Sequence, residues 1–266
     1  MYLNLGIIGM PLKHTLSPLI HSYFLNETGL CGGYNCYETI IDDLPDLISF
    51  FQKYSFTGVN VTVPYKEEII NFCDELDITA QEIGAVNTLH FIDNKIIGHN
   101  TDIFGFHMML ENNNISTLGK RVLLLGAGGA SRSVIPYLHL NPPREFIITN
   151  RTIEKAENLA FLYGDYVDIA DLSSLKGMEF DIVINTTSMS LKGEPFQDFG
   201  FCIKESAIDM IYTPQETPFL ALYKDKNIKR VNGVDMLLYQ ALGSFHIWTG
   251  KEVNINKEFL YNQIYK

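Results

Sequence analysis

The stretch VLLLGAGGAS, residues 122–131, decides the fold of the second half of this chain. Its four leading apolar residues predict a buried strand, and the glycines that follow predict a tight turn into a helix. Glycine lets a phosphate approach the backbone closely, and the N-terminus of the next helix offers free N–H groups and the positive end of its dipole. We therefore predict a dinucleotide-binding turn, with an ordinary tight turn as the alternative.

The turn departs from the strict G-x-G-x-x-G spacing. Ser131 stands where the third glycine would be, and a small residue there still permits close packing of helix against strand. The residues of the turn itself are expected to bind the cofactor: Gly126, Ala127, Gly128, Gly129 and Ala130.

The end of the following strand indicates which dinucleotide is bound. NAD-selective folds usually carry an acid about 20 residues past the glycines, on the ribose hydroxyls. This strand ends instead in Asn150, Arg151 and Thr152, with Lys155 one turn further on. A guanidinium there can pair with a 2′-phosphate through charge-assisted hydrogen bonds. The sequence therefore predicts NADP, with a solvated surface arginine as the alternative.

Strand-like and helix-like segments alternate along the whole chain. In the second half the alternation is regular, including a helix expected over 217–227, and predicts a parallel, doubly wound, Rossmann-like sheet. The first half is α/β with a mixed sheet: a helix over 18–29 ends at Gly29, another is expected over 65–76, and a hairpin is expected around Asp93-Asn94.

Composition excludes several classes of function. Hydrophobic residues make up 46% of the 266 residues, so a substantial core can form. A net charge of -11 disfavours nucleic acid and anionic membranes as partners. The four cysteines and seven histidines show no metal-ligand spacing, so no metal is predicted. With neither a signal peptide nor a membrane-spanning apolar run expected, we anticipate a cytoplasmic enzyme acting on a small molecule, as a monomer or homodimer.

Nine short stretches, in order along nearly the whole chain, together resemble the shikimate dehydrogenase family. They are GMPLKHTLSPLIH (9–21), NVTVPYKE (60–67), GAVNT (84–88), GHNTD (98–102), GAGGASR (126–132), NRT (150–152), NTTSMSLKG (185–193), DMIYTPQETPFL (209–220) and NGVDMLLYQA (232–241). The resemblance implies reversible, NADP-dependent reduction of 3-dehydroshikimate to shikimate, a step towards chorismate and the aromatic amino acids. It also implies two α/β domains, with a cleft between them.

The expected division of the chain follows from the same resemblance. Residues 1–102 would form the substrate-binding domain, with C-terminal helices from 237–266 packing back on it. Residues 103–236 would form the NADP-binding domain.

The resemblance also assigns roles to individual residues. Lys66 and Asp102 match the family's catalytic lysine and its partner aspartate, which we expect to share the acid/base role. Burial would lower the pKa of such a lysine and a neighbouring carboxylate would raise it, so the working protonation state stays open. The substrate would be held by Thr15, Ser17, Thr62, Asn87, Tyr212 and Gln240, with Gly233 near the nicotinamide.

One departure from the family's sequence pattern leaves the identity of the substrate undecided. The family usually has serine at the position of Thr15, and the added methyl group could shift preference among shikimate, quinate and related acids. Two alternatives therefore remain: a quinate/shikimate dehydrogenase of broader specificity, and a non-catalytic NADP-binding sensor. The presence of both Lys66 and Asp102 argues against the sensor.

Overall fold

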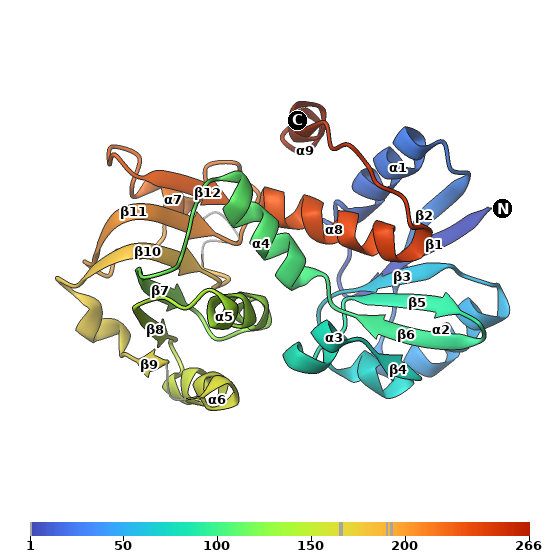
Figure 1. Ribbon diagram of the computed structural model, residues 1–266, viewed down its shortest axis with the longest axis horizontal. Helices are drawn as coiled ribbons and strands as arrows, with labels where there is room; N and C mark the ends of the chain where they lie inside the picture. Colours follow the sequence, from blue (N-terminus) through green and yellow to red (C-terminus); the bar gives the residue numbers. More distant parts are fainter. Residues whose placement is uncertain (1, 165–166, 190, 192–193) are drawn as a thin grey trace. The chain divides into compact units, whose positions relative to one another are not determined.

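The computed structural model describes residues 2–164, 167–189, 191 and 194–266. The chain divides into two compact units (Figure 1). Unit 1 runs to Gly105 and takes up Leu238–Ile264 and Lys266, whereas unit 2 comprises Phe106–Leu237 and Tyr265. Two of the changes of unit fall within helix α4 (Asp102–Asn112) and helix α8 (Val234–Thr249), and the others fall within the last three residues. Within the described residues, no helix is both long and apolar enough to cross a membrane.

Unit 2 is built on a six-stranded sheet in which every pairing is parallel. The strands are β7 (Arg121–Leu125), β8 (Glu145–Thr149), β9 (Asp168–Ile169), β10 (Glu179–Asn185), β11 (Cys202–Asp209) and β12 (Lys229–Asn232). The helices are α5 (Ser131–Leu140), α6 (Ile153–Tyr163) and α7 (Pro218–Ala221), with a 3-10 helix η3 (Leu172–Leu175). The order β12-β11-β10-β7-β8-β9 reverses direction at β7, as in doubly wound nucleotide-binding sheets. The predicted Rossmann-like fold is confirmed.

The apolar run 122–125 lies near the centre of this sheet. Val122, Leu123, Leu124 and Leu125 are all buried, because a parallel strand flanked on both sides is covered on both faces. The apolar side chains of β7 and β10 pack with Phe219 of α7 in one core cluster. This core holds the carboxyl ends of β7 and β10 side by side, where the glycine turn leaves the sheet.

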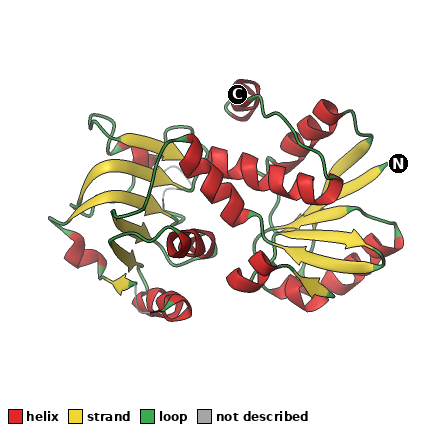
Figure 2. Ribbon diagram, in the orientation of Figure 1, coloured by secondary structure: helices red, strands yellow, loops and turns green. Residues whose placement is uncertain are grey.

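Unit 1 contains a mixed sheet of order β2-β1-β3-β5-β6-β4 (Figure 2). Its strands are β1 (Leu3–Gly9), β2 (Gly32–Glu38), β3 (Gly58–Val61), β4 (Glu75–Leu76), β5 (Thr88–Ile92) and β6 (Lys95–His99). Its helices include α1 (Ser17–Thr28), α2 (Leu44–Lys53), α3 (Ile78–Ile83) and α9 (Lys257–Ile264), with 3-10 helices η1 (Ile41–Asp43) and η2 (Glu68–Phe72). The predicted mixed α/β architecture is confirmed.

Two local features of unit 1 follow from turn chemistry. Gly29 ends α1 in the left-handed conformation, as predicted, with φ 65°. Asp93 and Asn94 have φ values of 50° and 59° and join β5 to β6 as a two-residue hairpin loop. Aspartate and asparagine tolerate positive φ, so the sequence located this turn correctly.

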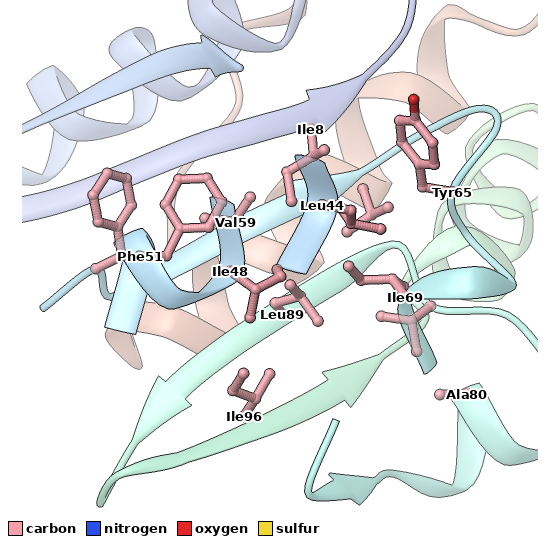
Figure 3. Close-up of a cluster of buried hydrophobic side chains, with 13 residues drawn as sticks. Ile8, Leu44, Ile48, Phe51, Val59, Tyr65, Ile69, Ala80, Leu89 and Ile96 are labelled. Carbon is pink, nitrogen blue, oxygen red and sulfur yellow. The ribbon is translucent and has the colours of Figure 1, made fainter. Parts of the chain in front are cut away.

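Figure 3 shows the core under one face of this sheet. Leu44, Ile48 and Phe51 of α2 pack against Ile8 of β1 and Val59 of β3 in one cluster. Tyr65 and Ile69 enter the same cluster from the segment after β3. Burial of these two side chains anchors the chain on either side of Lys66.

Two helices predicted from the sequence are wrong in extent. In place of a helix over 65–76, the chain forms η2 and then β4, because β4 pairs with β6 and Asp74 donates its N–H to Ile96 O at 2.8 Å. The helix predicted over 217–227 ends at Ala221. Beyond it the backbone N–H groups of 222–224 reach back three residues, which makes turns.

Candidate active site

The glycine turn of unit 2 is built as a close approach between two strand ends. Gly126 has φ 107°, and a Cβ on it would lie 2.7 Å from Thr186 Oγ1. Ser131 Oγ donates to Gly126 O at 2.8 Å and lies 2.7 Å from Thr186 Oγ1. Ser131, in the third glycine position, is therefore small enough for close packing and also joins the first turn of α5 to the ends of β7 and β10 through its hydroxyl.

The other glycines of the turn are open. A Cβ at Gly128 or Gly129 would have no neighbour within 4 Å, so a ligand can approach the backbone there. The Ala127 N–H donates to Asn150 Oδ1 at 3.2 Å, and Asn150 Nδ2 donates to Thr152 O at 2.8 Å. Asn150 thus joins the turn after β7 to the loop after β8 and sets the spacing of the two.

A cavity of about 890 Å³ lies over this edge of the sheet. Its lining includes nearly all of the residues predicted to bind the cofactor: Gly126, Ala127, Gly128, Gly129, Asn150, Arg151, Thr152 and Lys155. The same lining holds the loop after β10, from Thr186 to Met189, and apolar side chains such as Phe196. Of the 185–193 stretch, residues Ser190, Lys192 and Gly193 lie outside the described residues.

The donors of this cavity fit a phosphorylated dinucleotide. Arg151, Thr152 and Lys155 are exposed side chains on its wall, and no acidic residue ends β8. Open glycine backbone at the start of a helix suits a pyrophosphate, while a guanidinium with a nearby ammonium suits a phosphate on the ribose. The cofactor residues predicted from the sequence are thereby gathered in one place, apart from Gly233 and Ala130, which the lining does not include.

Behind the cavity a buried carboxylate organises two loops. Asp209 accepts hydrogen bonds from Asn185 Nδ2 at 2.9 Å, the Ile211 N–H at 3.1 Å and Thr217 Oγ1 at 2.6 Å. Burial raises the pKa of Asp209 to about 6, and these hydrogen bonds limit the rise. Asn185 Oδ1 in turn accepts from the N–H and Oγ1 of Thr187, so Asp209 steadies the loop that lines the cavity.

Tyr212 and Gly233 both belong to unit 2. Tyr212 is half-buried, and burial raises the pKa of its hydroxyl. A Cβ at Gly233 would lie 2.2 Å from Met210 O, so only glycine fits against the loop after β11. Gly233 therefore has a packing reason beside its predicted role near the nicotinamide.

Unit 1 brings together the lysine and aspartate that the sequence singled out. Lys66 Nζ donates to Asp102 Oδ2 at 2.6 Å, with 30% and 15% of the two side chains exposed. The Lys66 carbonyl accepts from the Val86 N–H at 2.7 Å, which fixes the backbone of Lys66 beside β5. Asp102 opens α4, where its N–H donates to Asn100 Oδ1 at 2.9 Å. The backbone of each residue of the pair is thus fixed by a hydrogen bond, while both side chains remain partly exposed. An acid/base pair must be able to reach the group with which it exchanges a proton.

Asn87 completes this group from the residue before β5. Its Nδ2 donates to Asp102 Oδ1 at 2.8 Å and to Thr101 Oγ1 at 3.0 Å. Its Oδ1 accepts from the Thr101 N–H at 2.9 Å and from Thr88 Oγ1 at 2.8 Å. Two donors and two acceptors fill the hydrogen-bonding capacity of an amide. Asn87, predicted to hold a substrate hydroxyl, is thus engaged in orienting Asp102.

The remaining predicted substrate residues of unit 1 lie on separate elements. Thr15 Oγ1 donates to Ser17 Oγ at 3.2 Å at the start of α1, so these two hydroxyls are adjacent. Thr62 follows β3, with its N–H bonded to Ile8 O at 2.9 Å. Gln240 lies on α8, where its carbonyl oxygen lies 3.1 Å from Ser244 Oγ.

Sequence reasoning missed four polar residues of the site. Thr88, Thr101 and Ser244 are buried around Asn87, and Thr186 closes the glycine turn. Thr88 and Thr101 stand beside Asn87 and Asp102 in GAVNT and GHNTD, so a hydroxyl next to each predicted site residue was the available signal. For Ser244, a hydroxyl residue among the apolar residues of a helix was the only signal.

Comparison with known proteins covers both units. Family models match residues 7–89 as a shikimate dehydrogenase substrate binding domain and residues 109–192 as shikimate / quinate 5-dehydrogenase. A third, shikimate 5'-dehydrogenase C-terminal domain, matches residues 233–257. Together these models match 192 of the 266 residues.

Individual relatives agree with the family models. Shikimate dehydrogenase (NADP(+)) of Carboxydothermus hydrogenoformans is 40% identical, over 92% of this chain and 91% of its own. A crystal structure of shikimate 5-dehydrogenase from Thermus thermophilus with NADP(H) and shikimate has 32% identity and a TM-score of 0.86, with 95% of each chain covered. A structure of the Listeria monocytogenes enzyme with shikimate and NAD has 27% identity and a TM-score of 0.85, covering 97% of this chain and 96% of its own.

Proposed function

The chain belongs to the shikimate dehydrogenase family, and from that premise we propose that it reduces 3-dehydroshikimate to shikimate, reversibly, with NADP as the cofactor. The observation that carries the proposal is the Lys66–Asp102 pair, joined at 2.6 Å and oriented by Asn87. A protein that only sensed NADP would have no use for such a pair.

The cofactor would be held by the cavity over the glycine turn of unit 2. Gly128 and Gly129 would receive the pyrophosphate on open backbone, and Arg151 with Lys155 would hold the 2′-phosphate. Bound NADPH supplies the hydride for reduction of the ring ketone. Gly233 and Tyr212, also in unit 2, are proposed to lie near the nicotinamide and the substrate respectively.

Unit 1 is proposed to transfer one proton to or from the substrate oxygen and to bind the carboxylic acid substrate. In reduction, Lys66 Nζ would donate a proton to the substrate oxygen as it becomes a hydroxyl; in oxidation the same nitrogen would take the proton back. Asp102 accepts a hydrogen bond from Lys66 Nζ and so keeps the ammonium aimed at one place. The position of Asp102 is fixed in turn by Asn87 Nδ2.

Substrate recognition is proposed to rest on neutral hydroxyl and amide groups. Thr15 and Ser17 would hold the carboxylate at the N-terminus of α1, where the helix dipole also favours an anion. Thr62 and Gln240 would hold ring hydroxyls. Such a site accepts an anion despite the overall charge of -11, because its donors act locally. It would reject analogues lacking a hydroxyl, because buried partners would be left unpaired.

An absorbance assay of NADPH formation tests the proposal directly. Purified protein is expected to reduce NADP⁺ with shikimate as the electron donor, and more slowly with quinate. Comparable rates with both acids would favour the broader quinate/shikimate activity that Thr15 leaves open. Binding of NADP without turnover of either acid would establish the sensor instead and overturn the proposal.

Replacing Arg151 by alanine tests the cofactor assignment. We expect the dissociation constant for NADP⁺ to rise by about 10- to 100-fold, because a hydrogen bond to a charged group contributes about 1.5–3 kcal/mol. The constant for NAD⁺, which has no 2′-phosphate, should change little. Titration of both cofactors against the protein measures the two effects.

Arg144→Ala is the matched control, since Arg144 is an exposed arginine preceding the opposite end of β8. It is expected to leave both constants unchanged. Equal weakening of NADP⁺ and NAD⁺ by Arg151→Ala would show that Arg151 does not recognise the phosphate.

We also propose a cellular location, an oligomeric state and a role for each unit. The acidic charge and the small polar substrate favour a cytoplasmic enzyme without nucleic acid or membrane partners, acting as a monomer or homodimer. Unit 1 is proposed as the substrate-binding domain and unit 2 as the NADP-binding domain.

A further inference from the structure

Four buried polar side chains of unit 1 form a closed ring of contacts. Ser244 Oγ lies 2.7 Å from Thr88 Oγ1, which donates to Asn87 Oδ1 at 2.8 Å. Asn87 Nδ2 donates to Thr101 Oγ1 at 3.0 Å, and Thr101 Oγ1 lies 3.2 Å from Ser244 Oγ. Ser244 and Thr88 are fully buried, and Asn87 and Thr101 are at most 5% exposed. The ring joins α8 to the two chain segments that carry Asn87 and Asp102.

The hydrogen atoms of the ring can be assigned by counting. Asn87 Oδ1 has two lone pairs, and the shortest contacts fill them with Thr88 Oγ1 and the Thr101 N–H. The hydroxyl hydrogen of Thr101 is then left for Ser244 Oγ. That of Ser244 goes to Thr88 Oγ1 at 2.7 Å, the shorter of its two contacts, since the carbonyl oxygen of Gln240 lies 3.1 Å away. Every hydroxyl donates once, in the same direction round the ring, which is the arrangement in which hydrogen bonds strengthen one another.

Asn60 adds a hydrogen-bond donor to the ring from outside. Its Nδ2 donates to Ser244 Oγ at 2.9 Å and lies 3.1 Å from Asn87 O and 3.2 Å from Thr88 Oγ1, while its Oδ1 accepts from Tyr34 Oη at 2.8 Å. With Asn60 and Thr101 as donors, Ser244 Oγ accepts two hydrogen bonds and donates one, which is the full capacity of a hydroxyl.

The second N–H of Asn87 links the ring to Asp102, whose Oδ1 accepts this hydrogen bond at 2.8 Å. The other oxygen of Asp102 holds Lys66 Nζ. Gly243, next to Ser244, packs closely on Thr101, since a Cβ there would lie 3.2 Å from Thr101 Cγ2. Whatever fixes the amide plane of Asn87 therefore fixes the carboxylate of Asp102 and, through it, the lysine.

We propose that Ser244 is a positioning residue of this enzyme: from α8 it closes the hydrogen-bond ring that holds Asn87, and so aligns Asp102 and Lys66 for proton transfer. Ser244 touches neither substrate nor cofactor in this proposal. The inference rests on the proposed function, because alignment of the pair matters only if the pair moves a proton.

Opening the ring at two points tests the proposal. Ser244→Ala and Thr88→Val each remove one hydroxyl, and each is expected to lower kcat about tenfold while the KM values for shikimate and NADP⁺ stay within about twofold. Thr88→Ser keeps the hydroxyl and is expected to restore kcat to near the wild-type value. A merely structural role would not produce this split, nor be rescued by serine.

Thr117→Val supplies the matched control. Thr117 is a fully buried threonine of unit 2 whose hydroxyl donates to Asn141 O at 2.9 Å. Its loss should cost stability of the same order as Thr88→Val and leave kcat unchanged. If the control lowers kcat as much as Ser244→Ala does, loss of stability explains both, and the proposal is wrong.

A second measurement does not depend on turnover. In an NMR exchange experiment the side-chain amide protons of Asn87 should exchange slowly with water in the wild type and markedly faster in Ser244→Ala. Wild-type kcat together with unchanged exchange in Ser244→Ala would overturn the proposal while leaving the dehydrogenase activity standing. Wild-type protein inactive on shikimate would defeat the proposed function instead, whatever the exchange rates show.

Discussion

Lys66→Ala is expected to lower kcat by about 10²- to 10⁴-fold, the usual contribution of a positioned acid/base group. The physical reason is the absence of any other described cation bonded to Asp102: its two carboxylate oxygens hold Lys66 Nζ at 2.6 Å and Asn87 Nδ2 at 2.8 Å. Steady-state rates of NADPH formation with shikimate measure kcat. Titration of NADP⁺ should give an almost unchanged dissociation constant, since the cofactor cavity is lined by residues of unit 2.

Lys95→Ala provides the comparison for this variant. Lys95 forms an ion pair with Glu75 at 2.5 Å, but both side chains are more than half exposed. The pair therefore contributes little to the stability of the fold. Its removal should leave kcat unchanged. If Lys66→Ala weakened NADP⁺ binding as much as it lowered kcat, Lys66 would be a structural residue and the proposed chemistry would fail.

The second large effect concerns the acid stability of unit 1 and depends on His21. This side chain of α1 is fully buried and stacks on Tyr34 with ring centroids 4.3 Å apart. Phe24 and Trp248 also lie against it, at 5.6 and 5.3 Å. Neither ring nitrogen makes a hydrogen bond to a described residue within standard distance. Burial lowers the pKa of His21 to about 3, and the nearby Asn60 side chain offsets only part of that shift.

The sign of the pH effect follows from the depressed pKa. Between about pH 6.5 and pH 3 the unfolded chain carries a proton on His21 that the folded protein does not, so unfolding takes up a proton and stability falls as the pH falls. A shift from 6.5 to about 3 corresponds to about 5 kcal/mol over the full range. His21→Phe removes this titration and keeps the aromatic packing.

Urea unfolding at a series of pH values measures the effect. The free energy of unfolding of His21→Phe relative to wild type should improve by about 3 kcal/mol between pH 7.5 and pH 4. Fluorescence of Trp248 reports the transition in the right place, because it is the one tryptophan of the chain and it contacts His21. Contributions of other carboxylates and histidines cancel in the difference between the two proteins.

The exposed histidine His14 serves as the control. His14→Gln should give a difference from wild type that barely changes with pH. A flat difference for His21→Phe as well would mean that His21 is hydrated or protonated in the folded protein.

The structure also shows where sequence reasoning stopped. The predicted helix over 65–76 looked helical by its own composition, but β4 pairs with β6, and a partner about 20 residues away in sequence is invisible to local periodicity. Asn87 was predicted to hold a substrate hydroxyl, and its four hydrogen bonds show that it also orients Asp102, which the sequence did not indicate. Ser244 offered only its polarity within an apolar helix as a signal, because its hydrogen-bond partners Asn60, Thr88 and Thr101 lie in three other parts of the chain.

The sequence alone predicted the doubly wound unit around 122–131 and the cofactor-binding residues at the ends of β7 and β8, from apolar periodicity, glycine spacing and the absence of an acid after β8. The resemblance to the shikimate dehydrogenase family, and no local pattern, singled out Lys66 and Asp102. Only the tertiary structure decided that Asn87 orients Asp102, that Ser131 and Thr186 close the glycine turn, and that His21 is sealed among aromatic rings. Hydrogen-bond partners and burial are set by residues far apart in the chain, so no local pattern encodes them.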